Sequence, residues 1–285
     1  MELSRLTNPL LRGAFLAAGA FDGTVSCHGR DVHHYVFRGE GQVPLVLLHG
    51  LASSAGGYLR VARQFRKHFS TVYVPELPGH GHTRSWDGAF PSFDDVLDVF
   101  ADYLGHIEAP CVLLGNSLGG GLAFRLAHRR PDRVRALVLF APAGARVSDE
   151  RFHQTVRQFR VESNRDARVM LERLFHRAPR ALLPFSFVMK SFYGTPVVKT
   201  LLQRVSPEDA VEPEVLRALT MPTLLLWGQS EKVLPYEGVH YFREHLPSSA
   251  NVAEVEGYGH LPHIETPGDA VRRVVEFLRD QGLCA

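Results

Sequence analysis

The chain has 285 residues, of which 45% are hydrophobic, and its formal net charge is +2 at pH 7. This length and apolar content suffice for a full hydrophobic core, and α/β domains of this size are often single units. The near-neutral charge gives no general attraction to nucleic acid, and no block of like charge indicates a tail. The three cysteines are widely separated, which argues against a disulfide framework and against a zinc cluster.

The amino-terminal segment from Leu10 to Phe21 is fairly apolar, but Arg12 interrupts it and the acidic Glu2 precedes it. A secretory signal has a basic start and an uninterrupted apolar run, so we expect a helix packed on the body of the protein. A membrane-proximal or targeting role for this segment stays open. No stretch approaches the roughly 20 apolar residues that span a bilayer. We therefore expect a cytoplasmic protein without stable membrane insertion.

Short apolar runs alternate with segments of helical length along most of the chain. Unalternated apolar runs are typical of strands buried on both faces of a parallel sheet. The runs cover residues 44–48, 71–74, 111–114, 134–140, 223–227 and 251–255. Helical segments cover residues 58–68, 93–106, 118–129, 236–245 and 270–280. This alternation predicts a mostly parallel, doubly wound α/β sheet, with catalytic groups in loops beyond the carboxyl ends of the strands.

Residues 144–221 break this rhythm, because they show helical patterns but no convincing strand. We expect a helical cap here, inserted between two late strands. The core then has two parts: residues 1–143, with the amino-terminal helix and nucleophile loop, and residues 222–285, with the acid and histidine loops. Aromatic and apolar side chains of the cap are candidates for the substrate pocket: Leu174, Phe175, Phe185, Phe187, Met189, Phe192 and Tyr193.

The segment Gly115-Asn-Ser117-Leu-Gly119 fits the pattern G-x-S-x-G, directly after an apolar run and before a helical segment. A serine at such a sharp strand–turn–helix junction presents its hydroxyl above the sheet as a nucleophile. The alternative is a glycine-rich helix start that binds phosphate. A Walker motif would need Gly-Lys-Ser/Thr after the loop, and the chain lacks it. Ser117 is therefore the predicted nucleophile.

A serine hydroxyl needs a base to take its proton, and His260 follows the last predicted strand within a glycine-rich loop. His263 is a local competitor, but the glycines before His260 favour an exposed loop apex there. Glu231 is the one carboxylate in the loop after residues 223–227, so it is the candidate acid that orients the imidazole. A solvated glutamate beside Lys232 is the alternative for that position.

The tetrahedral intermediate of acyl transfer needs preorganised N–H donors for its oxyanion. His49-Gly50-Leu51 comes directly after a predicted strand, and Leu118 follows the nucleophile. The backbone N–H groups of Leu51 and Leu118 are the predicted donors. No metal-ligand spacing appears among the histidines, so we expect no metal site.

With these motifs in order along nearly the whole chain, the sequence resembles the capped α/β-hydrolase superfamily, in its esterase, C–C hydrolase and haloperoxidase-like branch. The motifs are His49-Gly50, Leu77-Pro-Gly-His-Gly81, Gly115-Asn-Ser-Leu-Gly-Gly120, Trp227-Gly228…Pro235 and Gly259-His260…Pro262-His263. The resemblance implies a Ser–acid–His triad without a cofactor. The family usually has Asp where this chain has Glu231, so either the loop accommodates the extra methylene or another carboxylate, such as Asp149, serves instead.

The resemblance also narrows the reaction. A serine nucleophile disfavours the relatives that use aspartate, the haloalkane dehalogenases and epoxide hydrolases. The meta-cleavage C–C hydrolases tend to carry Trp after the histidine, where this chain has Leu261, and their oxyanion loop differs from residues 51–54. Hydrolysis of a carboxylic ester or thioester is therefore favoured. The alternatives are a C–C bond hydrolase and a non-catalytic ligand-binding protein of the same fold.

The predicted cap is basic in an almost neutral protein: nine arginines and five carboxylates lie between Arg146 and Arg180. A solvated helical surface is one interpretation. The sharper hypothesis is that this face receives an acidic carrier partner or an anionic substrate. We therefore expect a small-molecule ester or thioester substrate, no nucleic acid, and an acidic carrier as a candidate partner.

Overall fold

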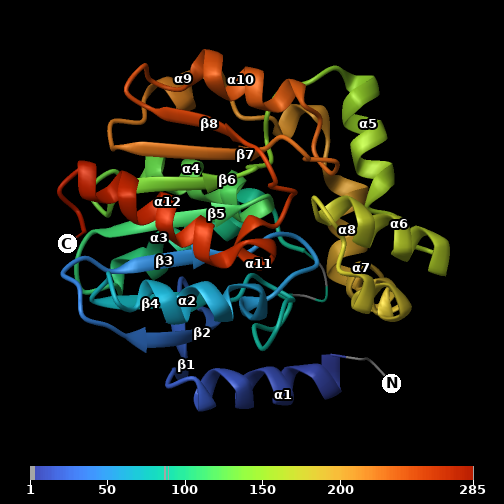
Figure 1. The fold of residues 1–285 in the computed structure, drawn as a ribbon, viewed down its shortest axis with the longest axis horizontal. Coiled ribbons are helices and arrows are strands. Elements are labelled where there is room, and N and C mark those ends of the chain that lie inside the picture. Colours follow the sequence, from blue (N-terminus) through green and yellow to red (C-terminus); the bar gives the residue numbers. More distant parts are fainter. Residues whose placement is uncertain (1–3, 87, 89, 285) are drawn as a thin grey trace.

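A computed structural model describes residues 4–86, 88 and 90–284 (Figure 1). Its centre is an eight-stranded sheet with the order β1-β2-β4-β3-β5-β6-β7-β8. The strands are β1 (Phe21–Cys27), β2 (Arg30–Arg38), β3 (Leu45–Leu48), β4 (Thr71–Pro75), β5 (Cys111–Asn116), β6 (Val134–Phe140), β7 (Thr223–Gly228) and β8 (Asn251–Val255). Strand β2 pairs antiparallel with both β1 and β4, and the remaining pairs are parallel.

Helices cover both faces of this sheet (Figure 1). One apolar cluster joins the sheet to α1 (Ser4–Ala17), α2 (Leu59–Phe65) and α12 (Pro267–Asp280). A second cluster joins it to α3 (Phe93–Gly105), α4 (Leu118–Arg129), α9 (Pro213–Arg217) and α10 (Glu237–His245). Strands β3 to β7 are buried along their whole lengths apart from one residue of β6, which explains their unalternated apolar sequences. The predicted doubly wound α/β sheet, the α/β-hydrolase fold, is confirmed.

The hairpin of β1 and β2 at the edge of the sheet was not predicted from the sequence. Strand β1 is mostly solvent-accessible and its sequence is polar, so it lacks the apolar run that marked the inner strands. Its turn residues His28 and Gly29 both have positive φ, 48° and 72°. Such a two-residue turn matches the twist of the paired strands.

The segment between β6 and β7 contains helices that lie together on one side of the sheet (Figure 1). They are α5 (Asp149–Gln158), α6 (Asn164–Leu174), the 3₁₀ turn η2 (Arg180–Phe185), α7 (Val188–Tyr193) and α8 (Pro196–Arg204). These helices have an apolar cluster of their own, which includes Met170, Leu174 and Val198. The last helix of the segment, α9, instead packs in the core. That residues 144–221 act as a separate cap stays a prediction.

The amino-terminal helix α1 packs on the outer hairpin. The ring of Phe15 is fully buried and stacks on Tyr35 of β2, with 3.9 Å between ring centroids. Much of the rest of the described helix surface is exposed. Within residues 4–86, 88 and 90–284, no helix combines the length and apolar character needed to cross a membrane.

Candidate active site

Ser117 lies at the turn between β5 and α4. Its backbone dihedrals are φ 54° and ψ −118°, a conformation that non-glycine residues rarely adopt. The turn is tight because a side chain on Gly119 would overlap the carbonyl oxygen of Leu48, and one on Gly115 would overlap the backbone of Gly119. These glycines therefore let the strand reverse into the helix and leave the serine at the apex.

His260 and Glu231 form a buried pair on the adjacent loops. His260 Nδ1 lies 2.7 Å from Glu231 Oε2, and both side chains are less than 5% exposed. The other carboxylate oxygen, Glu231 Oε1, accepts hydrogen bonds from the N–H groups of Val233 (2.6 Å) and Leu234 (3.0 Å). Glu231 thus has three hydrogen-bond contacts, two to backbone N–H groups and one to the imidazole, which fix the orientation of its carboxylate. An Nδ1–H bound to carboxylate leaves Nε2 free to accept a proton.

The backbone of His260 is held from two sides. Asn116, the residue before the nucleophile, donates from Nδ2 to the carbonyl oxygen of His260 at 3.0 Å. The N–H of His260 donates to the carbonyl oxygen of Leu174 at the end of α6, also at 3.0 Å. Ser117 and His260 line the same cavity. This contact of Asn116 was not predicted from the sequence, although the residue lies within the G-x-S-x-G motif.

Glu265 links this loop further to the segment after α6. Its Oε2 accepts from the N–H of His176 at 2.9 Å and from the N–H of Gly259 at 3.3 Å. The histidine loop and residues 174–177 therefore form one hydrogen-bonded unit. No sequence pattern indicated this contact, because it joins residues that are 89 positions apart.

The two alternatives left open by the sequence lie elsewhere. His263 is buried, its ring stacks on Tyr58 at 4.5 Å, and its Nδ1 has no hydrogen-bond partner among the described residues. Burial, with a smaller contribution from His260, lowers the pKa of His263 to about 3. Asp149 is exposed at the first position of α5. The structure thus brings Glu231, and not Asp149, to the imidazole of His260.

Two further histidines brace the loop that follows β3. His49 Nε2 accepts the N–H of Leu77 at 3.0 Å, and His80 Nε2 accepts the N–H of Ala52 at 3.2 Å. Burial lowers the pKa of both imidazoles, that of His49 to about 3, so both rings stay neutral and can accept these bonds. The sequence offered no signal for these roles beyond the glycine spacing around each histidine.

The braced loop lies against the nucleophile, where the oxyanion donors were expected. A side chain on Gly50 would come within 3.2 Å of the Ser117 Cβ. Leu51 and Leu118 line the cavity at Ser117. Leu118 is the first residue of α4, and the first N–H groups of a helix have no partner within it. Both predicted donors therefore border the reaction centre.

Two cavities meet at Ser117. The smaller one, of about 170 Å³, extends along the inner side of α5 and is lined mainly by apolar residues. The larger one, of about 1160 Å³, extends between α1, α7 and the histidine loop. Leu51, Ser117 and Phe159 line both of them. An ester at Ser117 can therefore extend in two directions.

Most of the cap residues predicted to line the pocket border the larger cavity: Leu174, Phe175, Met189, Phe192 and Tyr193. The prediction for Phe185 and Phe187 is corrected, because these rings are 61% and 50% exposed and border neither cavity. Within this segment Ser186 is buried and Leu183 and Met189 are partly buried, whereas Phe185 and Phe187 face solvent.

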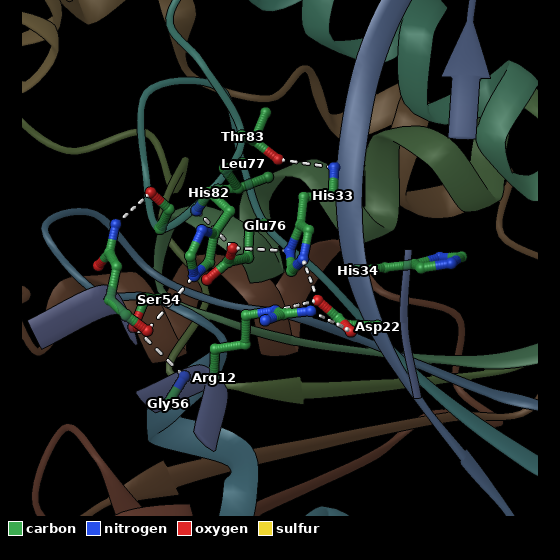
Figure 2. Close-up of polar contacts among 12 residues, drawn as sticks. Arg12, Asp22, His33, His34, Ser54, Gly56, Glu76, Leu77, His82 and Thr83 are labelled. Atoms are coloured by element: carbon green, nitrogen blue, oxygen red, sulfur yellow. Dashed lines mark hydrogen bonds and ion pairs between the residues drawn. The ribbon is translucent and has the colours of Figure 1, made fainter. Parts of the chain in front are cut away.

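A second polar cluster lies under the larger cavity, on the side of α1. Figure 2 shows Arg12 of α1 bound to Asp22, which lies 3.5 Å from His33 Nε2. His33 Nδ1 in turn lies 3.0 Å from Oε2 of the fully buried Glu76, and this oxygen also accepts the N–H of His82. The cluster fixes the loop after β4, which also carries His80, to the hairpin and to α1.

Comparison with known proteins agrees with this geometry. A family model described as serine aminopeptidase, S33, matches residues 40–267. The chain is 27% identical over 261 residues to a pimeloyl-[acyl-carrier protein] methyl ester esterase of Chromobacterium violaceum, covering 85% of this chain and 96% of that protein. It is 28% identical over 288 residues to a monoacylglycerol lipase of Rattus norvegicus, covering 90% of this chain and 83% of that protein.

Among solved structures, that of a bacterial membrane phospholipase A is similar, with a TM-score of 0.78, 25% sequence identity, and coverage of 98% of this chain and 91% of that one. The sheet order, the serine at the strand–helix turn and these similarities agree. The chain therefore belongs to the S33 family of the α/β-hydrolase superfamily, and it is a serine ester hydrolase.

Proposed function

We propose that this hydrolase cleaves carboxylic esters or thioesters through an acyl-enzyme on Ser117. The observation that carries the proposal is the buried contact of 2.7 Å between His260 Nδ1 and Glu231, on the loop that shares a cavity with the serine. A carboxylate at Nδ1 fixes the tautomer whose Nε2 takes a proton, and it stabilises the imidazolium that forms. A serine hydroxyl needs that base.

The proposed reaction has two halves. Ser117 Oγ attacks the carbonyl carbon while His260 Nε2 takes its proton, and the N–H groups of Leu51 and Leu118 bind the resulting oxyanion. The imidazolium then gives that proton to the leaving alkoxide or thiolate, which leaves the acyl group on Ser117. In the second half, water attacks the acyl-enzyme, His260 takes the proton of the water and returns it to Ser117, and the carboxylic acid departs.

The two alternatives differ from this proposal in measurable ways. A fluorophosphonate labels only an activated serine, so labelling of the wild-type protein and not of Ser117→Ala excludes a purely ligand-binding role. A panel of p-nitrophenyl esters of increasing acyl length then reports turnover and the acyl range. A C–C hydrolase would be labelled too, but it would turn over a meta-cleavage dienol-ketone faster than any ester of the panel.

The base is tested by two matched variants. We expect His260→Ala to lose as much activity as Ser117→Ala, because triad members act as a unit and their losses do not add. Activity of about 10³-fold over water can remain from the oxyanion donors. His263→Ala, three residues away, should keep far more activity. A larger loss in His263→Ala than in His260→Ala would refute the assignment of the base.

We further propose that the substrate is bound to an acidic carrier, which contacts the arginine-rich face formed by residues 146–180. Three of its nine arginines, Arg146, Arg151 and Arg168, form ion pairs with glutamates, while Arg157 and Arg160 are exposed on α5 and just after it. Attraction to an anionic substrate is screened by salt, with a Debye length of about 10 Å at 0.1 M. We expect kcat/KM for a carrier-bound ester to fall with ionic strength while that of a neutral ester does not. If kcat/KM has the same salt dependence for both esters, the arginines form only a solvated surface and bind no carrier.

A further inference from the structure

Exposed apolar side chains line the larger cavity or lie in the chain segment next to its lining residues. Leu10 of α1 and Leu182 of η2 line this cavity and are 76% and 45% exposed. Phe185 and Phe187 lie in the short segment between Leu182 and Met189, a further lining residue. We call Leu10, Leu182, Phe185 and Phe187 the apolar rim. Among the described residues seven large apolar side chains are exposed, and four of them belong to this rim. Such clustering marks an interaction surface.

The described charged residues that line this cavity are cationic. Arg84 and Lys190 line the cavity, and no aspartate or glutamate is among its described lining residues. Arg177, three residues before η2, and Arg180, its first residue, are also exposed. Apolar side chains flanked by cations are the combination that binds an interface of acyl chains and anionic headgroups.

The two parts of the rim are held in place by the fold. On α1, Asn8 Nδ2 donates to the carbonyl oxygen of Gly81 at 2.6 Å, and Arg12 binds Asp22, which belongs to the polar cluster of Figure 2. Figure 1 shows the amino-terminal end of α1 on the same side of the molecule as α7. The α1 side of the rim is therefore anchored, and on the other side Leu183 and Met189 pack against the apolar cluster of the helices between β6 and β7.

We propose that the apolar rim seats on an anionic lipid surface, with its four side chains among the acyl chains and the nearby cations at the headgroup phosphates. The cavity then opens toward the lipid, and an ester-bearing lipid can reach Ser117 without crossing water. This last step rests on the proposed function, whereas the docking itself does not. An acidic protein fits this surface less well, because the side chains nearest the opening are bulky and apolar and the exposed arginines of α5 and α6 lie in another segment.

The test is co-sedimentation of the full-length Ser117→Ala protein with vesicles, since this variant does not consume the lipid. One set contains phosphatidylcholine alone and the other about a third phosphatidylglycerol. We expect clear binding to the anionic set. The double variant Phe185→Ser/Phe187→Ser should lower the partition coefficient by about tenfold or more, because it removes the two rings that would be buried among the acyl chains. Arg84→Gln and Lys190→Gln should each lower it about fivefold on anionic vesicles only.

Phe21→Ser is the matched control, since Phe21 is 65% exposed on β1 and does not line the cavity. It should bind like the parent protein. Equal loss in Phe21→Ser and the rim variant, or no binding to either vesicle set, would overturn the proposal. Binding of the rim to an acidic acyl carrier protein but not to vesicles would overturn it as well. Failure of the wild-type protein to hydrolyse a soluble p-nitrophenyl ester, with vesicle binding intact, would refute the proposed function and leave the docking standing.

Discussion

The proposed role of Glu231 can be tested by changing one oxygen atom of its carboxylate. In Glu231→Gln, one carboxylate oxygen becomes an NH₂ group. The N–H groups of Val233 and Leu234 both need an acceptor, and they now bind Oε1 at 2.6 and 3.0 Å. The amide oxygen of the glutamine must stay with them, so its NH₂ group faces His260 Nδ1, which accepts a hydrogen bond instead of donating one. The imidazole then carries its proton on Nε2 and cannot take the proton of Ser117.

The size of the effect follows from this tautomer change. Loss of the correct tautomer with intact geometry lowers kcat by about 10⁴-fold, or about 5 kcal/mol of transition-state stabilisation. Glu231→Asp keeps an acceptor-only side chain, so the tautomer survives if the loop closes over the shorter residue. We expect Glu231→Asp to retain more activity than Glu231→Gln.

The assay is hydrolysis of p-nitrophenyl acetate, with kcat and KM measured separately and thermal unfolding measured on the same samples. The loss should fall on kcat, because the carboxylate acts on the base and does not contact the ester. Fluorophosphonate labelling should slow in parallel. Equal and mild losses in Glu231→Gln and Glu231→Asp, with both proteins folded, would refute the assignment and point to another carboxylate.

Two further predictions concern strain and buried histidine. Because Ser117 has a φ of 54°, Ser117→Gly relieves backbone strain, and it should be more stable than Ser117→Ala by about 1 kcal/mol in urea unfolding, although both are inactive. His263 has a folded pKa of about 3 and an unfolded pKa of about 6.5, so the unfolded state binds one more proton between these values and stability falls as pH drops through that window. His263→Phe, which keeps the stacking on Tyr58, should flatten the slope of the unfolding free energy there by about 1.4 kcal/mol per pH unit; an unchanged slope would mean that another group titrates.

The inner strands and the nucleophile turn could be predicted because local chemistry fixes them. A strand buried on both faces must be apolar throughout, and the six predicted runs coincide closely with β3 to β8. The turn at Ser117 needs glycines that no other residue replaces, as the close approach of Gly119 to Leu48 shows. The candidate for the acid could be narrowed to Glu231 because it is the one carboxylate of its loop before the next helix.

Other features depend on contacts that the linear sequence does not mark. Strand β1 lies at the sheet edge, where burial does not select an apolar run. Phe185 and Phe187 lie where η2 ends and α7 begins, and their exposure depends on how these two short elements turn, while the sequence shows only an aromatic-rich segment. The supporting bonds of Asn116 and Glu265 reach residues 144 and 89 positions away. Long-range partners of this kind follow from topology and not from local pattern.

The segment around Leu174, at the larger cavity, and the loop that carries His260 were treated separately in the sequence, but they contact each other in the structure. Leu174 lines the larger cavity, and its carbonyl oxygen accepts the N–H of His260. Glu265 ties the N–H of His176 to that of Gly259 in the histidine loop. The segment that shapes the substrate cavity therefore also sets the position of the proposed base. Because a base works only within hydrogen-bond reach of the serine, a shift of α6 changes proton transfer as well as binding. We therefore expect substrates that contact this segment to differ in kcat as well as in KM, which kinetics on the p-nitrophenyl ester panel would measure.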